Sequence, residues 1–364
     1  MKLPRVAVVE RIAAVARTLT LLAQGLVLLA CAGTPPATGS DEQAAVRIAL
    51  VGDIMLGGTA TEFVERHGYD YPFEHVRSEL ARVDLVFGNL EGPLTDGGEA
   101  LDKRFVFRTP PDKVAPALAR AGFDVLSLAN NHTLDYGPEG LFDTLDALSD
   151  ASLHAVGAGA DLDAARQPVI LDSGGLRVGF LAYSNTFPEA FWATDQRPGT
   201  AFGHERHIRE DVTRLRAQVD VLVVSFHWGQ EATTDLRDYQ PRLGRAAIDA
   251  GADIVAGHHP HILQGVEVYN GGVIFYSLGN FTFGSYSEIA RTSAIARVMA
   301  DGDGLVSVEL IPINVYNPEV LFRPHVLEGA PAQDVIDELQ RLSVPLHTHI
   351  RAEGDRASVV LPAR

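Results

Sequence analysis

Short apolar runs alternate with longer amphipathic stretches over most of the chain. Each apolar run ends abruptly in polar side chains, which is typical of strands buried in a parallel sheet. The amphipathic stretches have helical length, and proline or glycine stands near several of their ends. Strands are predicted at 46–51, 84–87, 123–128, 178–183, 219–226, 253–256 and 273–276. Helices are predicted at 61–67, 112–121, 138–148, 207–218, 239–250 and 332–342.

Two regions depart from this alternation. Residues 184–203 hold Phe187 and the pair Phe191 and Trp192 with little periodicity, which predicts an irregular loop that lies over the site as a lid. The region after residue 285 has shorter apolar runs, and a loose tail is expected after its helix. The runs predicted there as strands are 293–299, 305–311 and 319–326.

The alternation of strands and helices predicts an α/β fold. The chain of 364 residues is longer than one ordinary domain but fits one large α/β domain with extensions. In open α/β sheets, ligands bind at the carboxyl ends of the strands. The residues that follow the predicted strands are therefore the first candidates for a functional site.

Potential ligand side chains follow five of the predicted strands. Each has an ordinary explanation as a helix cap, a turn residue or a hydrogen-bonded core histidine. Seven separate explanations are a less economical account than one shared site, so the pattern favours a common polar or metal site. The seven residues are Asp53, Glu91, Asn131, His132, His227, His259 and His261.

The sequence His259-Pro260-His261 is a local signal within this set. In an extended segment, side chains two residues apart point to the same side, and Pro260 stiffens the link between the two histidines. Imidazole is the commonest protein ligand for transition metals. The spacing alone is a weak signal, and a hydrogen-bonded, histidine-rich loop remains the alternative.

The first 30 residues have the layout of a signal peptide. Basic residues between Lys2 and Arg17 precede the apolar run 19–30, which is short for a membrane span. Cys31 follows directly and is the only cysteine of the chain, so no internal disulfide is possible.

Residues 28–31 (LLAC) resemble a bacterial lipobox, in which the cysteine becomes the lipid-modified first residue. We therefore expect an exported lipoprotein, at the outer face of the cytoplasmic membrane or in the periplasm, with residues 31–45 as a flexible tether. Plain secretion with cleavage near Ala32 and an uncleaved anchor are the alternatives.

The chain is acidic, with a formal net charge of −17 at pH 7. Removing residues 1–30 removes four basic residues and one acidic residue, which leaves a charge of about −20. Such a surface repels nucleic acid and any polyanion that is not held locally. Nucleic acid is therefore not expected as a partner.

Five spaced motifs resemble the bacterial capsule synthesis protein family CapA, which is named for the production of a poly-γ-glutamate capsule. The resemblance covers roughly residues 46–285, expected as one CapA-like domain, and residues 286–364 are expected to complete the sandwich. The motifs are VGDIMLGG (51–58), GNLEGPLT (88–95), SLANNHTLDYGPEGL (127–141), FHWGQE (226–231), and GADIVAGHHPHILQG with IFYSLGNF (251–265 and 274–281).

The family is similar to calcineurin-like metallophosphoesterases, which implies a four-layer αββα sandwich of the metallo-dependent phosphatase type. The resemblance also implies a divalent metal ion (Mn, Zn, Fe or Mg). Met55 and Asn89 stand where that pattern has His and Asp, and the loss of a bridging carboxylate favours one ion over two. Glu91 is expected to supply the missing charge. The implied metal ligands are Asp53, Glu91, Asn131, His227, His259 and His261.

The resemblance implies roles for the remaining candidates as well. His132 is expected to be a general acid, with Asp135 orienting its ring. Basic side chains of the stretch KRFVFR (103–108) are expected to bind an anionic substrate. The expected substrate-binding residues are Lys103, Arg108, Asn89 and Asn280.

The resulting hypothesis is a lipid-anchored protein in the synthesis, anchoring or export of an anionic capsule polymer such as poly-γ-glutamate, with a metal-dependent hydrolytic or transfer site. Membrane-embedded capsule synthesis or export subunits are the expected protein partners. Two alternatives stay open. One is a metallophosphoesterase acting on an envelope phosphoester or another small anionic substrate. The other is a non-catalytic polymer-binding subunit.

Overall fold

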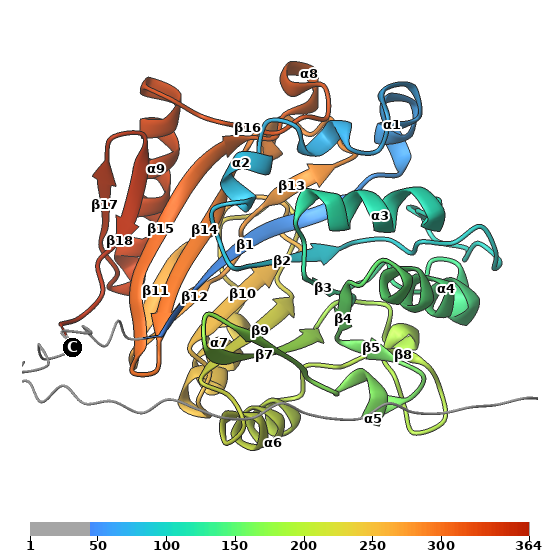
Figure 1. Ribbon diagram of the computed structural model, residues 1–364, viewed down its shortest axis with the longest axis horizontal. Coiled ribbons are helices and arrows are strands. Elements are labelled where there is room, and N and C mark those ends of the chain that lie inside the picture. The colour runs from blue at the N-terminus through green and yellow to red at the C-terminus, as the bar shows by residue number, and fades with distance from the viewer. Residues whose placement is uncertain (1–43, 364) are drawn as a thin grey trace, which may run out of the picture. The chain divides into compact units, whose positions relative to one another are not determined.

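The computed structural model describes residues 44–363, and two large β-sheets form its centre (Figure 1). The strands of the first sheet are β1 (Ala45–Met55), β2 (Leu85–Leu90), β3 (Val125–Ser127), β4 (His154–Val156), β13 (Asn280–Phe283), β14 (Thr292–Asp301), β15 (Gly304–Asn314), β16 (His325–Val326), β17 (Ile350–Glu353) and β18 (Arg356–Val359). Their order is β17-β18-β15-β14-β1-β2-β3-β4, with β13 beside β1 and β16 beside β15. Strands β1 to β4 are parallel, whereas β14 is antiparallel to β1.

The second sheet has six strands in the order β11-β12-β10-β9-β7-β6. These are β6 (Val169–Ser173), β7 (Leu176–Ser184), β9 (Val221–His227), β10 (Ile254–His258), β11 (Val266–Tyr269) and β12 (Gly272–Phe275). Strands β7, β9, β10 and β12 are parallel. A small separate ladder joins β5 (Ala158–Gly159) to β8 (Gly199–Thr200).

Nine α-helices lie within the described residues. They are α1 (Thr61–His67), α2 (Arg77–Leu80), α3 (Pro111–Ala121), α4 (Gly137–Asp150), α5 (Leu162–Ala165), α6 (Glu205–Arg216), α7 (Tyr239–Asp249), α8 (Asn317–Val320) and α9 (Ala330–Ser343). All six helices predicted from the sequence are confirmed to within two residues at each end, and each predicted strand before residue 285 is confirmed. None of the helices in this part of the chain is long and apolar enough to cross a membrane.

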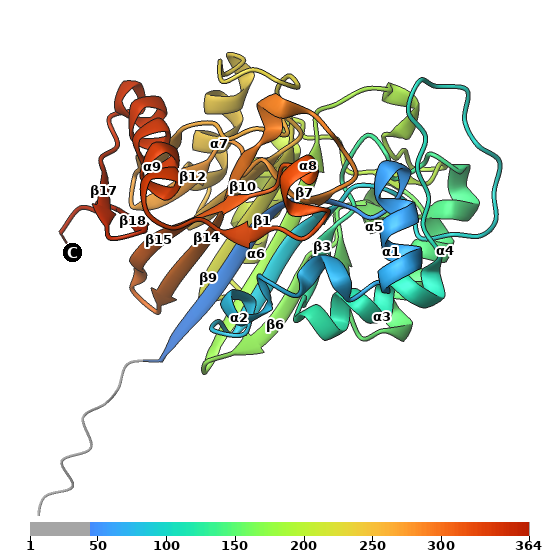
Figure 2. The same cartoon turned by 90° about the horizontal axis from the view of Figure 1, so that it is seen from above.

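The period-two alternation along the strands builds separate cores on the two faces of each sheet. In β1, Ile48 packs between the two sheets, whereas Ala49 packs with residues of α3 and α4. In β9, Val223 packs between the sheets and Val224 packs with α6 and α7. The layers are therefore α3 and α4, the first sheet, the second sheet, and α6 and α7 (Figures 1 and 2). This confirms the α/β class and the four-layer αββα sandwich.

The C-terminal region belongs to the same sandwich. Strand β14 pairs with β1 from Ala45 to Leu50, and α9 packs beside β15, β17 and β18 (Figure 1). Of the strand predicted over 319–326, only the last two residues are confirmed, as β16, because Leu321 and Phe322 have positive φ and Pro324 lacks an N–H donor. The predicted loose tail is wrong, since β17 and β18 form a hairpin that extends the first sheet.

The proposed signal peptide (1–30), most of the tether (31–45) and the lipidation site Cys31 lie outside the described residues. These assignments stay predictions.

Candidate metal centre

The carboxyl ends of the parallel strands from both sheets meet at one place. Asp53 of β1 lies opposite Asn89 of β2 and Asn280 of β13, and His227 of β9 lies opposite His258 of β10. Gly52 permits this close approach, because a Cβ atom at that position would lie 2.0 Å from the carbonyl oxygen of Gly279.

Asp53 is fully buried and fixed from three sides. Asn89 Nδ2 donates a hydrogen bond to Asp53 Oδ1 at 2.8 Å, and the backbone N–H of His259 donates to Oδ2 at 3.2 Å. The Nδ1 atom of His261 lies 3.1 Å from the same Oδ2. Burial favours the neutral carboxyl, but the hydrogen bond and charge of His261 outweigh burial and hold the pKa of Asp53 below its usual value.

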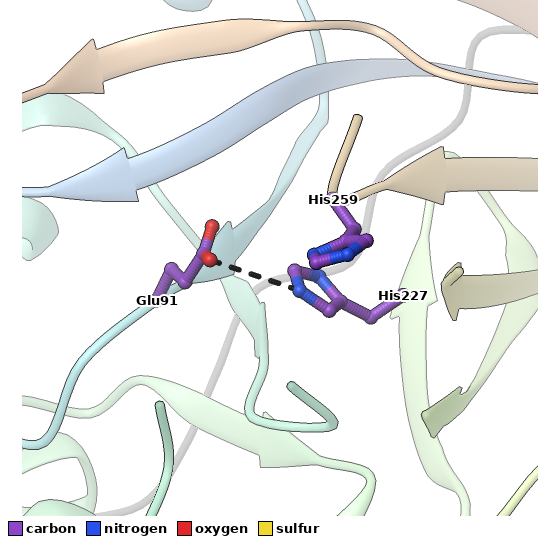
Figure 3. A group of neighbouring side chains, drawn as sticks. All are labelled: Glu91, His227 and His259. Atoms are coloured by element: carbon purple, nitrogen blue, oxygen red, sulfur yellow. Dashed lines mark ion pairs between the residues drawn. The ribbon is translucent and has the colours of Figure 1, made fainter. Parts of the chain in front are cut away.

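Glu91 follows β2 and is also fully buried, but neither of its carboxylate oxygens has a hydrogen-bond partner among the described residues. Three imidazole Nε2 atoms surround Oε1 at distances too long for hydrogen bonds: 3.7 Å for His227, 3.8 Å for His261 and 3.9 Å for His132. Figure 3 shows the carboxylate directed toward His227, with His259 beside that ring. Burial raises the pKa of Glu91 well above its usual value.

His227 and His259 are buried next to each other, with ring centroids 4.8 Å apart. His227 Nε2 lies 2.7 Å from Asn131 Oδ1, and its Nδ1 lies 3.2 Å from Asn89 Nδ2. Because burial disfavours the charged imidazole, the pKa of His227 lies well below its usual value, and that of His259 falls to about 3. The Nδ1 atom of His259 has no hydrogen-bond partner in the described part of the chain.

The histidine-rich loop after β10 has an uncommon backbone. His259 and His261 have φ values of 96° and 60°, in the left-handed region that non-glycine residues seldom adopt. His261 Nδ1 lies 3.0 Å from Asn280 Oδ1. Burial lowers the pKa of His261, but the charges of Glu91 and Asp53 outweigh burial and raise it to about 10. Such local strain is concentrated at functional sites.

His132 is held by a carboxylate and a lysine. Its Nδ1 atom lies 2.7 Å from Asp135 Oδ2, and Lys103 Nζ lies 2.5 Å from Asp135 Oδ1. The ring of Phe107 packs on His132 with the centroids 4.8 Å apart. The expected orienting contact between Asp135 and His132 is therefore present, and the ring's Nε2 atom is left to face Glu91.

All seven residues of the predicted cluster thus come together. Three overlapping groups of side chains at this site suit a metal ion, because the ligand atoms within each group lie within 4.8 Å of one another. Glu91 belongs to two of the groups, and its unpartnered buried oxygens fit a cation in the space between them. The groups are Glu91, His227 and His259; Asp53, Glu91 and His261; and Glu231, His259 and His261.

Of the predicted substrate-binding residues, the two basic ones are engaged by other groups of the protein. Lys103 is engaged by Asp135 and by the backbone oxygen of Asn131, which accepts a hydrogen bond at 2.6 Å. Arg108 lies over the ring of Tyr136 and donates a hydrogen bond to the backbone oxygen of Asp96. Asp135 engages Lys103, and neither side chain lines either of the two cavities described below, so substrate binding by Lys103 and Arg108 stays a prediction.

The two asparagines differ from each other. Asn89 is fully buried, bonded to Asp53, and accepts a hydrogen bond from Asn130 Nδ2 at 3.1 Å, so it supports the site rather than meeting a substrate. Asn280 lines a cavity at the site, as its predicted role requires.

Glu231 was not predicted as a site residue. It follows β9 by four residues, and its carboxylate completes one of the three candidate groups. The signal that pointed to Glu91, a carboxylate close behind a strand end, applies to Glu231 as well. By contrast, His258 is structural, because Ser225 Oγ at 3.3 Å and the backbone oxygen of Val51 at 3.1 Å engage its two ring nitrogens.

Two cavities open at the cluster. The larger cavity has a volume of about 1180 Å³ and includes Asn131 and His259 in its lining. The smaller cavity has a volume of about 230 Å³ and includes His132 and His261. Parts of the irregular segment 184–203, the predicted lid, line the larger cavity together with Glu205, Arg237, Tyr239 and Arg242.

Comparison with known proteins gives a consistent set of similarities. Residues 47–285 match the family model described as bacterial capsule synthesis protein PGA_cap. The chain is 35% identical over 282 residues to the capsule biosynthesis protein CapA of Bacillus anthracis, covering 75% of this chain and 68% of that protein. It is 36% identical over 295 residues to the PGA biosynthesis protein CapA of Bacillus subtilis, covering 80% and 77%.

Among solved structures, the chain is similar to the NAD nucleotidase of Haemophilus influenzae, with a TM-score of 0.48 and 12% identity. That match covers 81% of this chain and 56% of the nucleotidase chain.

Proposed function

This chain belongs to the bacterial capsule synthesis protein family, and on that premise we propose that it is an exported, lipid-anchored accessory protein of polyglutamate capsule production with a metal-dependent hydrolase or transferase site. The family membership supports the capsule polymer as the biological setting. The geometry of the strand-end cluster supports the metal-dependent chemistry.

One observation carries the proposal: the buried carboxylate of Glu91 has no hydrogen-bond donor within residues 44–363, while three imidazole nitrogens surround it at 3.7–3.9 Å. A buried carboxylate without a partner is costly, so a fold keeps one only where something else compensates its charge. A divalent cation between the carboxylate and the imidazoles provides that compensation. Ligand atoms of one ion are expected at such mutual distances, because each lies about 2 Å from the metal.

The proposed ligands come from both sheets. When bound, a divalent ion supplies Lewis acidity to an acyl or phosphoryl oxygen of the substrate. His132 is the proposed general acid. Asp135 accepts a hydrogen bond from its Nδ1 atom and so directs Nε2 to the site, and Nε2 gives up a proton when the ring is doubly protonated. Lys103 holds Asp135 in place for this task. The proposed ligands are Asp53, Glu91, Asn131, His227, His259 and His261, with Glu231 as an additional carboxylate.

The larger cavity is the proposed binding place for the anionic polymer. Arg237 is exposed and lines this cavity together with Asn131 and His259 of the cluster. The chain as a whole is strongly acidic, so an arginine beside the site offers a polyanion a local grip. Bidentate contacts between arginine and carboxylate suit the side chains of a glutamate polymer.

The remaining parts of the proposal concern location. We place the protein at the outer face of the cytoplasmic membrane through a lipid on Cys31, where membrane-embedded capsule subunits are its partners. The lipobox-like sequence and the apolar run before it support this placement. If the Cys31→Ser protein stays membrane-bound and is still processed, this part of the proposal fails.

A substrate panel tests the chemistry. Tag-free protein is stripped with a chelator, reloaded with Mn²⁺, Zn²⁺, Fe²⁺ or Mg²⁺, and assayed on γ-glutamyl oligomers and on a set of phosphoesters. The proposal expects cleavage or transfer of γ-glutamyl oligomers that is lost with the chelator and restored by a metal. Inactivity on γ-glutamyl oligomers, with turnover of phosphoesters alone, contradicts it.

A metallophosphoesterase is the second candidate function. The observation that favours it is the match of Asp53, Asn131, His227, His259 and His261 to the ligand order of metallophosphoesterases, now seen to converge in space. Turnover confined to phosphoesters in the same panel supports this candidate. A protein that binds metal and polymer but turns over neither substrate class is the non-catalytic polymer-binding subunit.

A further inference from the structure

The larger cavity adjoins a further cavity, the outer cavity, whose lining includes Leu162, Thr194 and Arg197. The two cavities share the side chains of Trp192 and Phe202. We propose that the outer cavity is a second binding subsite. It holds residues of the glutamate polymer that are distant from the metal centre, while the reacting residue lies in the larger cavity. This inference rests on the proposed function, because it adds a subsite for the same substrate.

The segment 184–203, which was predicted as a lid, contributes to the linings of both cavities. Hydrogen bonds fix this segment to the rest of the protein, and its strand β8 pairs with β5 (Figure 1). The N–H of Asn185 donates to the backbone oxygen of His227 at 2.8 Å, and the N–H of Ala201 donates to that of Gly157 at 2.9 Å. Because the segment is held near both of its ends, the outer cavity is a preformed feature of the fold.

Aromatic rings of this segment lie where the two cavities meet. Trp192 Nε1 donates a hydrogen bond to the backbone oxygen of Thr186 at 3.1 Å, and the indole stacks on Phe202 with the centroids 4.0 Å apart. The ring of Phe187 lies 6.1 Å from that of Trp192 and is 72% exposed. A γ-linked glutamate chain has methylene groups in its main chain, so apolar rings suit the part of the chain between its carboxylates.

An arginine without an ion pair lines each of the two cavities. Arg237 lines the larger cavity and Arg197 lines the outer cavity, and neither pairs with a carboxylate of the described residues. Arg242 differs, because its guanidinium pairs with Glu205 at 2.5 Å. A polyanion that crosses the aromatic rings therefore meets an unpaired arginine on either side of them.

Arg197 extends from a turn with a fixed backbone. Its N–H and carbonyl group are hydrogen-bonded to Thr194 at 3.3 Å and 3.0 Å, and the carbonyl oxygen of Thr194 also accepts a hydrogen bond from the N–H of Leu162. The guanidinium is exposed, and its Nη2 atom donates to the backbone oxygen of Trp192 at 2.9 Å. Glu189 also lines the outer cavity, but it is exposed, so solvent and salt screen its charge.

Binding of γ-glutamyl oligomers of increasing length tests the inference. Tetramers and octamers are titrated by calorimetry, at low salt, into protein treated with a chelator, so that turnover does not affect the result. We expect the octamer to bind more tightly than the tetramer. Arg197→Gln is expected to lower the octamer affinity by up to about fivefold, which corresponds to one exposed ion pair.

Two further variants control this result. Arg197→Glu reverses the charge and is expected to lower the octamer affinity further, whereas a merely structural role of Arg197 would make its two variants alike. Arg351→Gln, at an exposed position of β17 outside both cavities, is the matched control and is expected to keep the wild-type affinity.

Tryptophan fluorescence locates the bound oligomer. The chain has two tryptophans, of which Trp192 lines both cavities and Trp228 is fully buried in the core. The octamer is therefore expected to change the fluorescence of wild-type protein but not that of Trp192→Phe.

The outcomes separate failure of the subsite from failure of the metal centre. Octamer binding of the expected pattern, in a protein that turns over no γ-glutamyl oligomer after metal reloading, supports the subsite and contradicts the proposed metal-dependent chemistry. Turnover of the oligomers with equal affinities for tetramer and octamer, or with equal octamer affinities in Arg197→Gln and Arg351→Gln, overturns the inference alone. Octamer binding that leaves the fluorescence of wild type unchanged, or no octamer binding, overturns it as well.

Discussion

Two buried glutamates, Glu79 and Glu91, differ in whether neighbouring side chains neutralise them. Glu79 of α2 accepts hydrogen bonds from three arginines: Arg82 and Arg356, each at 3.0 Å from Oε1, and Arg297 at 2.6 Å from Oε2. Glu309 pairs with Arg297 and Arg356 in turn. Burial raises the pKa of Glu79, but the hydrogen bond of Arg297 and the arginine charges outweigh it, so the pKa lies below the usual value.

Glu91 has potential partners as near as 3.7 Å and is bonded to none of them. Its pKa is shifted in the other direction, well above the usual value, because burial dominates. The difference separates two uses of a buried carboxylate: that of Glu79 stabilises the fold through ion pairs, whereas that of Glu91 is left open to bind a ligand. Glu79 is neutralised by its own chain, whereas the surroundings of Glu91 leave room for a cation that the chain does not supply.

The largest expected effect is on the turnover rate and comes from His132, which lies beside Glu91. Replacing His132 with Asn removes the proposed general acid and is expected to slow turnover by about 10²–10⁴-fold, while the unfolding free energy changes little. Steady-state kinetics on the active substrate, together with urea denaturation, measures both quantities. A wild-type rate in His132→Asn means that this histidine carries no proton in the reaction.

The next effect concerns Glu79. Glu79→Ala removes one of the two carboxylates that Arg297 and Arg356 share, and Glu309 still pairs with both arginines, so the loss of these charged hydrogen bonds is expected to cost about 2 kcal/mol. Urea denaturation monitored by circular dichroism is the measurement. If Glu79→Ala unfolds at the same urea concentration as wild type, Glu79 contributes no more to stability than Glu91, and the contrast between the two glutamates is wrong.

The pH dependence of stability gives a smaller effect. Because the folded-state pKa of Glu79 lies below the usual 4.5, its contribution is present above about pH 4.5 and is lost as the pH falls through the folded-state pKa. The difference in unfolding free energy between wild type and Glu79→Gln is therefore expected to shrink between pH 5 and pH 3. Denaturation curves at several pH values measure it, and a difference that grows toward pH 3 contradicts the sign.

The smallest effect is expected for Glu91→Gln in metal-free protein. The Glu91 carboxylate has no hydrogen bond to lose among the residues that the structure describes, so the unfolding free energy is expected to change by less than about 0.5 kcal/mol. The same substitution is expected to weaken metal binding, measured by titration calorimetry. A loss of stability in metal-free protein as large as that of Glu79→Ala removes the distinction between the two glutamates.

The position of the site could be predicted from the sequence, because residues that follow parallel strands lie at the same edge of the sheet. Asp53, His227 and His259 are far apart in the chain, but each follows a buried run, and parallel strands bring such positions to one edge. The helices were predictable for a similar reason, since caps and periodicity are local. The hairpin of β17 and β18 was not, because β17 is exposed over three of its four residues and shows no alternation.

The details within the site depend on contacts that the sequence does not reveal. Lys103 looked free to bind an anion, but the buried charge of Asp135 engages it. The smaller cavity also escapes sequence reasoning, because it forms between segments around Phe107, Ile262 and Ile289 that meet only in the folded chain. Side-chain pairing and cavity shape are set by tertiary packing, and neither leaves a periodic pattern or a motif in the sequence.

Metal stoichiometry tests the central claim most directly. Wild type, His259→Ala and His132→Asn are purified without a histidine tag, and their metal content is measured by mass spectrometry alongside their melting temperatures. The account predicts that His259→Ala loses metal and, with it, the stabilisation that a bound ligand gives, whereas His132→Asn keeps both. Equal metal content in all three proteins, or no metal in any of them after reloading, would contradict a metal centre built on His259.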